Sequence, residues 1–354
     1  NHFSCWLRAR TELALAQDLR PRTLADYKSV EHVREDLVRS MRRYRHERDR
    51  VIVADFLREA PDALPRVSRI GGGSLGGKAR GLAFANRLFI DAEIDRRFPA
   101  TRVWVPEFTV VGTDVFDQFL EENDLADFAV ESESEEEIEE RFLATRLPEE
   151  AVRDLEALLG VTRYPIAVRS SGLLEDLPEQ PFAGIYQTYM LANNEPDPRD
   201  RLEALLTAIK KVYASTFSRR AKTFLEMTPY RLEEEKMAVI IQRVVGAAHG
   251  ERFYPEFGGV ARSRNFYPTP PLRAEDGVVA IAMGLGQLVV EGGNCLRFCP
   301  KAPGHLVGFS SVDEILENSQ REFLALDLSG SMEGSEKRGM EGLVELGLAA
   351  AEED

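Results

Sequence analysis

Residues 70–81, with the sequence IGGGSLGGKARG, form a glycine-rich stretch that runs into a lysine. Gly72, followed after four residues by Gly77 and Lys78, matches the first part of a phosphate-binding P-loop. The next residue of a P-loop is a Ser or Thr whose hydroxyl binds Mg²⁺, and here it is Ala79. The stretch is therefore an incomplete P-loop, a flexible linker or a phosphate site of another kind.

Two observations bear on these alternatives. Residues 63–70, ALPRVSRI, predict a poor buried strand because they include two arginines and a serine, which disfavours a P-loop NTPase. A linker has no need of a lysine at the start of the amphipathic helix that residues 78–94 predict. Glycine N–H groups at a helix N-terminus form an anion site, and Lys78 adds a point charge. We therefore expect Gly76, Gly77 and Lys78 to bind phosphate, with any metal held elsewhere.

The composition limits the class of protein. The 354 residues suggest two or three domains, and 44% hydrophobic with 30% charged residues fits a folded protein with a sizeable core. The net charge of −15 argues against nucleic-acid or anionic-membrane partners. No apolar run approaches the ~20 residues of a membrane span, and no signal peptide is visible.

The cysteines and the first residue add two expectations. Cys5, Cys295 and Cys299 are too few for a disulfide framework and lack a matching pair for zinc. We therefore expect reduced thiols and a cytoplasmic protein. Because the sequence begins with Asn1, we also expect it to be part of a longer chain.

Periodicity and composition divide the sequence into four parts of an α+β protein. Residues 1–65 predict a helical segment, whose basic run at residues 39–50 is typical of a solvated helix face. Residues 66–235 mix strands and helices, with one helix that starts at Thr113 or Asp114 as its cap and one long helix at 197–227. Residues 236–328 are rich in strands. Residues 329–354 predict a tail that ends in a short apolar helix.

A second candidate site lies in AVRSSGLLED, residues 167–176. Arg169 stands where an apolar strand ends, a position suited to a phosphate or carboxylate ligand. The alternative is a salt bridge from Arg169 to Glu175 or Asp176. In the following PFAGIY, Ala183 and Gly184 predict a small turn whose N–H groups can face phosphates.

Five motifs in order resemble one known family. They are LGGKARGL, YPIAVRSSGLLED with PFAGIYQTYM, AVIIQRVVG, GGVARSRN and MGLGQLVVEGG. Over about residues 69–300 the sequence is similar to the ATP-grasp-type nucleotide-binding domain of phosphoenolpyruvate synthase and pyruvate phosphate dikinase, a domain that rifampicin phosphotransferase and glucan water dikinase share. The resemblance implies an ATP-grasp-like nucleotide-binding domain of two subdomains, preceded here by the helical N-terminal segment.

The resemblance also assigns residues. Lys78 and Arg169 would contact ATP phosphates and act in catalysis, and the strand around Gln242 would present backbone groups to the adenine edge. The residues assigned to the nucleotide are Gly76, Gly77, Lys78, Arg169, Ala183, Gly184, Gln242, Arg243, Val244 and Val245.

The sequence departs from the family near the metal. Where the family has GLGE, with its Glu near the metal and ribose, this chain has Gln287, a poorer Mg²⁺ ligand than a carboxylate. Glu291 could partly substitute, so Gln287 and Glu291 are the expected Mg²⁺ ligands. The family's following PD pair is replaced by a segment with Arg297 and Lys301, whose charge would favour phosphate over a divalent metal.

In this family the β-phosphate of ATP passes to a histidine on a mobile domain and then to substrate on a barrel domain. None of the histidines here lies in the family's glycine-rich phosphohistidine motif: His2, His32, His46, His249 and His305. His249 is expected to be a polar loop residue. The resemblance thus implies an ATP- and Mg²⁺-dependent phosphotransferase limited to the first half-reaction, with phosphohistidine and substrate domains in cis or in trans.

The replacement at Gln287 leaves an alternative open. The chain would then be a regulatory module that binds ATP with weak or no catalysis. A folded domain with a dead site is disfavoured because Lys78 and Arg169 are both present.

Overall fold

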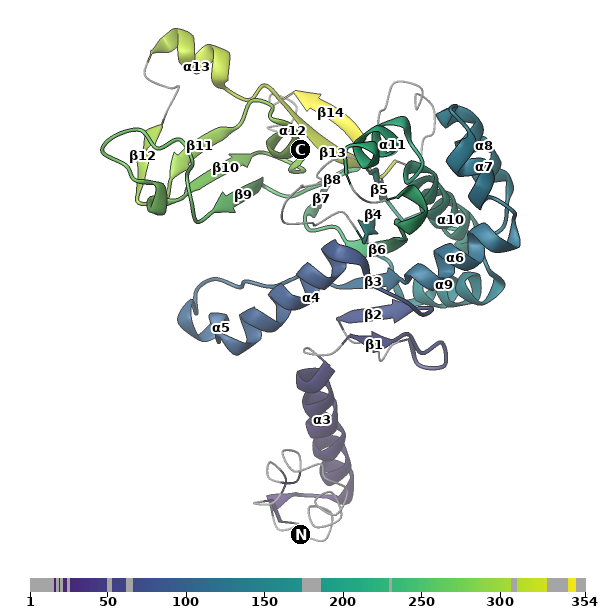
Figure 1. Ribbon diagram of the computed structural model, residues 1–354. Coiled ribbons are helices and arrows are strands. Elements are labelled where there is room, and N and C mark those ends of the chain that lie inside the picture. The colour runs from purple at the N-terminus through teal and green to yellow at the C-terminus, as the bar shows by residue number, and fades with distance from the viewer. Residues whose placement is uncertain are drawn as a thin grey trace.

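The computed structural model describes residues 16, 19, 22–23, 26–49, 53–61, 66–173, 186–228, 231–306, 311–329 and 343–347. These residues form an α+β fold with one six-stranded and two four-stranded sheets (Figure 1), which confirms the expected fold class. No helix among them is long and apolar enough to cross a membrane.

The six-stranded sheet, in the order β1-β2-β3-β6-β4-β5, forms the centre of the fold. Its strands are β1 (Ala54–Asp55), β2 (Val67–Ile70), β3 (Phe108–Val111), β4 (Ile166–Gly172), β5 (Thr188–Leu191) and β6 (Met237–Arg243). Strands β1, β2 and β3 are parallel, whereas β6 is antiparallel to both β3 and β4. Six successive residues of β6 are buried, because helices cover both faces of the sheet.

Six helices pack on one face of this sheet (Figure 1). They are α6 (Thr113–Glu122), α7 (Ala126–Glu131), α8 (Glu135–Ala144), α9 (Glu149–Val161), α10 (Pro198–Ser215) and α11 (Arg219–Glu226). A cluster of aromatic rings joins α6, α8 and α10, with Phe116 and Tyr213 4.9 Å apart between ring centroids and Phe119 and Phe142 5.5 Å apart.

The other face carries α4 (Gly76–Asp91), which leads into the short α5 (Ile94–Arg97). Ala79 of α4 is fully buried and packs with Val110 of β3 and with Ala238 and Ile240 of β6. The Gly76 end of α4 therefore lies against the middle of the sheet.

Two smaller sheets follow β6. One has the order β12-β11-β10-β9 and the other β14-β13-β8-β7. Their strands are β7 (Ala247–His249), β8 (Arg252–Tyr254), β9 (Gly258–Arg262), β10 (Val278–Ala282), β11 (Leu296–Cys299), β12 (Ala302–Leu306), β13 (Glu322–Asp327) and β14 (Leu343–Gly347). The short helices here are η3 (Leu232–Glu234), η4 (Ala274–Asp276), α12 (Gln287–Glu291) and α13 (Val312–Asn318).

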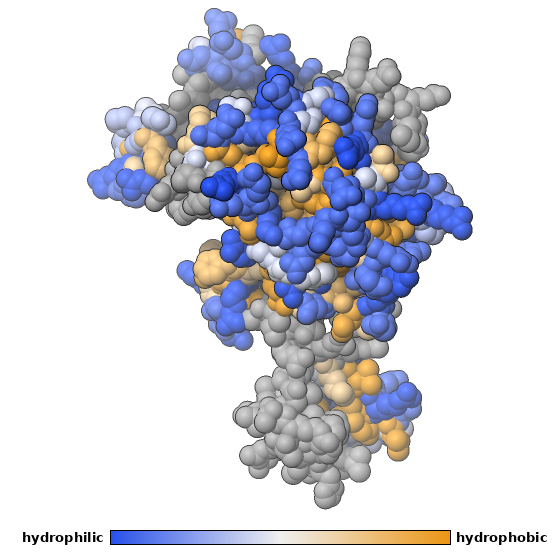
Figure 2. All heavy atoms as spheres, turned by 45° about the vertical axis from the view of Figure 1, so that its right-hand side comes forward, coloured by the Kyte–Doolittle hydropathy of each residue, from blue (hydrophilic) through white to orange (hydrophobic). Residues whose placement is uncertain are grey.

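At the N-terminal end, α3 (Val30–Asp49) extends away from the central sheet (Figure 1). Arg22 and Tyr27 both bond to Asp36 on this helix, each at 2.6 Å. Figure 2 shows apolar residues on its surface, where Val30 and Val38 are exposed.

The strand positions bear on the expected domain boundaries. β1 lies within the expected segment 1–65 but pairs with β2, and β6 follows the expected boundary at 235/236 but lies inside the first sheet. An apolar run shows that a strand is buried, but it does not show in which sheet. We propose that the boundaries fall before Ala54 and after Arg243.

Four local expectations were wrong. The long helix at 197–227 is two helices, because Phe217 packs into the aromatic cluster and Ser218 caps α11 by accepting from the Ala221 N–H at 3.3 Å. The described part of the C-terminal tail is strand β14, paired with β13, rather than a helix. The α6 N-cap is Gly112, without a side-chain bond, rather than Thr113 or Asp114.

The fourth concerns β2, which is a buried strand despite its polar residues. Ser68 shares a 2.8 Å hydrogen bond with Thr109 of β3, and Arg69 pairs with Asp55 of β1. The glycine stretch therefore does follow a buried parallel strand, as a P-loop would. Of the two arguments against a P-loop, only Ala79 remains.

Candidate nucleotide site

The glycine stretch connects β2 to α4 and is packed against its neighbours. A Cβ on Gly73 would overlap the side chains of Thr113 and Asp114, and Gly73 has a positive φ of 81°. The Thr113 hydroxyl accepts from the Ser74 N–H at 2.9 Å, and the Thr113 N–H donates to the Ser74 carbonyl at 3.1 Å. Thr113 thus holds the loop instead of capping its own helix.

The first turn of α4 is held by strand β4. The Ser171 hydroxyl accepts from the Ala79 N–H at 3.0 Å and donates to the Leu75 carbonyl at 2.8 Å. Gly76 has a φ of 72°, and a Cβ there would overlap the Ser171 carbonyl oxygen. Ala79 is fully buried in this contact, so the position where a P-loop has its metal-binding hydroxyl packs against the sheet.

The two predicted phosphate ligands lie on these elements. Lys78 of α4 donates from Nζ to the Ser170 hydroxyl at 3.2 Å, and Ser170 is the residue after Arg169 on β4. Arg169 donates from Nη1 to Oε1 of Gln242 on β6 at 2.9 Å. Both cations are half-buried. The structure therefore brings the Lys78 and Arg169 segments together at the N-terminus of α4, where an anion is favoured.

Two backbone N–H groups of the strand predicted to bind adenine already bond to neighbouring segments. The Arg243 N–H donates to the Glu107 carbonyl at 3.0 Å, and the Val244 N–H donates to the Pro165 carbonyl at 2.9 Å. These two N–H groups are therefore used within the protein. An adenine edge at this strand would meet backbone carbonyls or the Val245 N–H, and Val245 is 49% exposed.

The GLG loop lies beside this strand. Leu285 packs with Val244, with Ala167 of β4 and with Leu326 of β13, and its N–H donates to the Leu324 carbonyl at 2.9 Å. Gln287 is the first residue of α12 and Glu291 the last. The loop that leads to Gln287 is thus joined by packing to the strand that carries Gln242.

The predicted Mg²⁺ ligands are Gln287 and Glu291, at the two ends of α12. No group of three or more His, Cys, Asp and Glu side chains with a metal-binding arrangement occurs among the described residues. Mg²⁺ in nucleotide enzymes is bound through carboxylates and substrate phosphates together, and Gln287 offers only a neutral amide oxygen. The Glu291 side chain lies outside the described part, so its role as a ligand stays a prediction.

The two cationic residues expected near the metal, Lys301 and Arg297, differ in their surroundings. Lys301 donates to a carboxylate oxygen of Asp276 at 2.8 Å, and this bond lowers the pKa of Asp276. Its charge is therefore already paired. Arg297 lies on β11 and is exposed.

Several predicted residues lie outside the described part of the chain. They are Ala183 and Gly184 of the predicted turn, and Glu175 and Asp176, the alternative salt-bridge partners of Arg169. Among the described histidines, His32 is on α3, and His249 is on strand β7 rather than in a loop. The His249 ring stacks on Tyr254 with centroids 4.1 Å apart.

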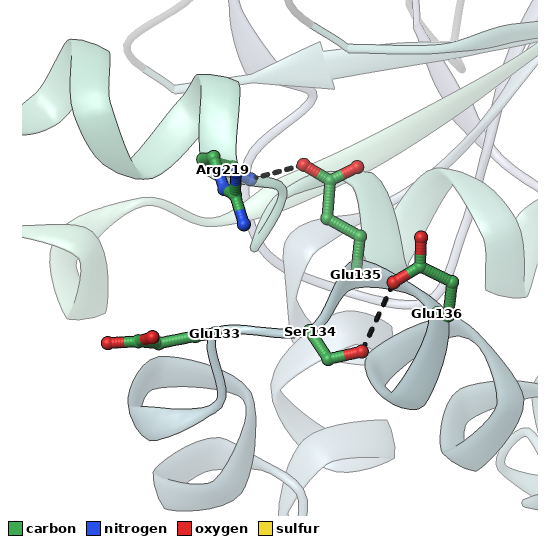
Figure 3. Close-up of a pocket in the computed structure, with 5 residues that line it drawn as sticks. All are labelled: Glu133, Ser134, Glu135, Glu136 and Arg219. Atoms are coloured by element: carbon green, nitrogen blue, oxygen red, sulfur yellow. Dashed lines mark hydrogen bonds between the residues drawn. The ribbon is translucent and has the colours of Figure 1, made fainter.

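A separate cavity lies where α8 and α11 begin (Figure 3). It is lined by Glu133, Ser134, Glu135, Glu136 and Arg219. The Glu135 carboxylate accepts from the Arg219 N–H at 2.7 Å, and the Ser134 hydroxyl accepts from the Glu137 N–H at 3.2 Å. The protein's own side chains thus cap both helix N-termini, so this cavity is a structural junction rather than a phosphate site.

Comparison with known proteins identifies the family to which the sequence is similar. Residues 73–300, well over half of the chain, match the family model described as pyruvate phosphate dikinase, AMP/ATP-binding domain. The chain is 28% identical over 193 residues to the uncharacterized phosphotransferase YvkC of Bacillus subtilis, and 29% identical over 210 residues to phosphoenolpyruvate synthase of Aeropyrum pernix. It is 28% identical over 164 residues to rifampicin phosphotransferase of Bacillus cereus.

The matched regions are a limited part of these relatives. They cover 53%, 53% and 45% of this chain, but only 20%, 23% and 17% of the respective relatives. The chain therefore spans less than a quarter of the length of each.

Proposed function

Because the chain belongs to the family of pyruvate phosphate dikinase AMP/ATP-binding domains, we propose that it binds ATP for a phosphotransferase similar to phosphoenolpyruvate synthase. The observation that carries this proposal is the position of Lys78 and Arg169. The two residues are 91 positions apart in the sequence, yet Lys78 bonds to the residue that follows Arg169.

The chemistry of these residues suits a polyphosphate. Phosphoryl transfer depends mainly on positioning and on neutralising phosphate charge. Lys78 offers a point charge and Arg169 a fork of donors, and both lie near a helix N-terminus that favours anions. Mg²⁺, when bound with ATP, would supply further neutralisation of phosphate oxygens.

The proposed reaction is transfer of the β-phosphate of ATP to a histidine on another domain, supplied in cis or in trans, in which AMP leaves from the β-phosphorus and the γ-phosphate is released by water as inorganic phosphate. His249 is not proposed as the acceptor, and its ring stacks on Tyr254 within the β7–β8 hairpin. The role of this chain would be to hold ATP with its phosphates fixed by Lys78 and Arg169.

A second candidate function is a regulatory module that binds ATP with little turnover. The observation in its favour is the neutral Gln287 at the expected metal position. In this case ATP would bind through the protein's cations, with weak dependence on Mg²⁺.

The experiment that separates the two functions combines binding with transfer. ATP is titrated calorimetrically, with and without Mg²⁺. ATP labelled at its β-phosphate is then incubated with the chain and a histidine domain from a phosphoenolpyruvate synthase. Binding followed by label on the histidine supports the phosphotransferase. Binding without label supports the regulatory module. No binding at millimolar ATP contradicts both.

A further inference from the structure

We propose that Ser171 is a positioning residue of the nucleotide site, whose hydroxyl fixes the N-terminus of α4, and with it Lys78, to the strand that carries Arg169. The proposal rests on the proposed ATP-binding function of this site. Neither the P-loop pattern nor the family match assigns Ser171 this role.

The first argument is that local side chains cap the start of α4 only in part. Its N-cap residue, Leu75, makes no side-chain hydrogen bond, and the neighbouring Ser74 hydroxyl accepts only from the Gly76 N–H, at 3.2 Å. Ser171 supplies a further cap from another element. It accepts from Ala79 and donates to Leu75, on the two sides of Lys78.

The second argument is that Ser171 itself cannot move easily. Its exposed fraction is 0%, and its backbone pairs with Ala238 of β6 near the end of β4. Two residues earlier on the same strand, Arg169 pairs with Ile240. The distance between the two phosphate ligands is therefore set by a strand of the central sheet, to which the helix start is bonded.

The third argument is that α4 has other attachments to the sheet. Ala79, Leu82 and Phe89 pack against the face formed by β3 and β6. Loss of the Ser171 hydroxyl would thus leave the helix in place but release its first turn. Because catalytic and binding geometry is sensitive to displacements of about 1 Å, we expect ATP affinity to fall more than overall stability.

The test uses two variants that remove the bond in different ways. Ser171→Ala removes the hydroxyl, and Ser171→Cys keeps a similar volume with a weak acceptor. Each should bind ATP on the order of tenfold more weakly than the wild type at a temperature where all proteins are folded. The matched control is Ser215→Ala, because the Ser215 hydroxyl is also buried and bonds to the Val212 carbonyl, but within α10 on the opposite face of the sheet.

The outcomes distinguish this inference from the function on which it rests. Weaker ATP binding by the Ser171 variants, with wild-type affinity in Ser215→Ala, is the expected result. Wild-type affinity in either folded Ser171 variant overturns the inference, whereas a wild type that does not bind ATP overturns the function instead. Should both variants fail to fold, hydrogen exchange of the Ala79 amide in the wild type decides: strong protection supports the bond, and rapid exchange contradicts it.

Discussion

Nη1 of Arg169 donates a 2.9 Å hydrogen bond to Oε1 of Gln242, which is 7% exposed. Gln242 was expected to offer backbone groups to adenine, but its side chain holds the guanidinium that is proposed to bind phosphate. This pair would thus join the proposed phosphate and adenine parts of the site.

Replacement of Gln242 should therefore affect phosphate binding. Gln242→Met removes the acceptor while it keeps the length of the side chain, and we expect about tenfold weaker ATP binding, from a hydrogen bond to a charged group worth ~1.5 kcal/mol. Calorimetric titration at fixed salt measures the effect. Unchanged affinity would mean that the Arg169–Gln242 bond has no part in nucleotide binding.

Ala79→Ser would complete the P-loop pattern, but we expect no gain in Mg²⁺-dependent binding. Ala79 is fully buried against the sheet, so an added hydroxyl has no access to a metal and overpacks the contact. The free energy of unfolding should fall by about 1–3 kcal/mol, as seen in denaturant titrations. Stronger ATP binding in the presence of Mg²⁺ would show that the position faces the nucleotide after all.

Gln287→Glu should increase the Mg²⁺ dependence of ATP binding. A carboxylate at the start of α12 is a better Mg²⁺ ligand than an amide. We expect the ratio of the ATP affinities with and without Mg²⁺ to rise on the order of tenfold. This is the change expected from one additional charge-assisted contact. The matched control is Gln287→Asn, which stays neutral. An unchanged ratio in Gln287→Glu would exclude this residue from the metal site.

Lys222 stabilises the fold rather than the site. Its Nζ donates to the carbonyls of Ala129, Val130 and Ser132 at 2.6–3.0 Å, where α7 ends. Lys222→Met should lower the free energy of unfolding by about 1–3 kcal/mol, because three partly buried carbonyls lose their donor. ATP affinity should not change. A variant as stable as the wild type would contradict this assignment.

The pH dependence of stability follows from the same lysine. Burial lowers the pKa of Lys222 below its ordinary value of 10.5, and burial likewise lowers the pKa of Lys210. In the pH range just below 10.5 the unfolded chain therefore binds more protons than the folded one, so the free energy of unfolding rises with pH there. This slope should decrease in the Lys210→Met and Lys222→Met double variant, as denaturant titrations between neutral pH and pH 10 would show.

Features that depend on local sequence could be predicted. A lysine at a helix start and an arginine at a strand end were sufficient to select Lys78 and Arg169 as candidates, whose role as phosphate ligands stays a prediction, and the order of the motifs identified the family. Neither the choice of these two residues nor the family required knowledge of the contacts between distant segments.

Features that depend on distant partners could not be predicted. Ser171 looks like the start of a polar loop until Ala79, 92 residues away, is placed beside it. The break at Phe217 likewise depends on an aromatic cluster drawn from three helices. The glycines around Gly73 have the composition of a linker, and only the position of Asp114 shows that close packing requires them.

The most direct test of the central claim is calorimetric titration of ATP into the wild type, Lys78→Ala, Arg169→Ala and the control Arg153→Ala. Arg153 is a cation on α9, paired with Glu149 and Glu150 on the other face of the sheet. The account predicts binding by the wild type and by Arg153→Ala, and at least tenfold weaker binding by each of the two site variants, since hydrogen bonds to charged groups are worth ~1.5–3 kcal/mol. Equal affinity in all four proteins, or no binding by the wild type, would contradict it.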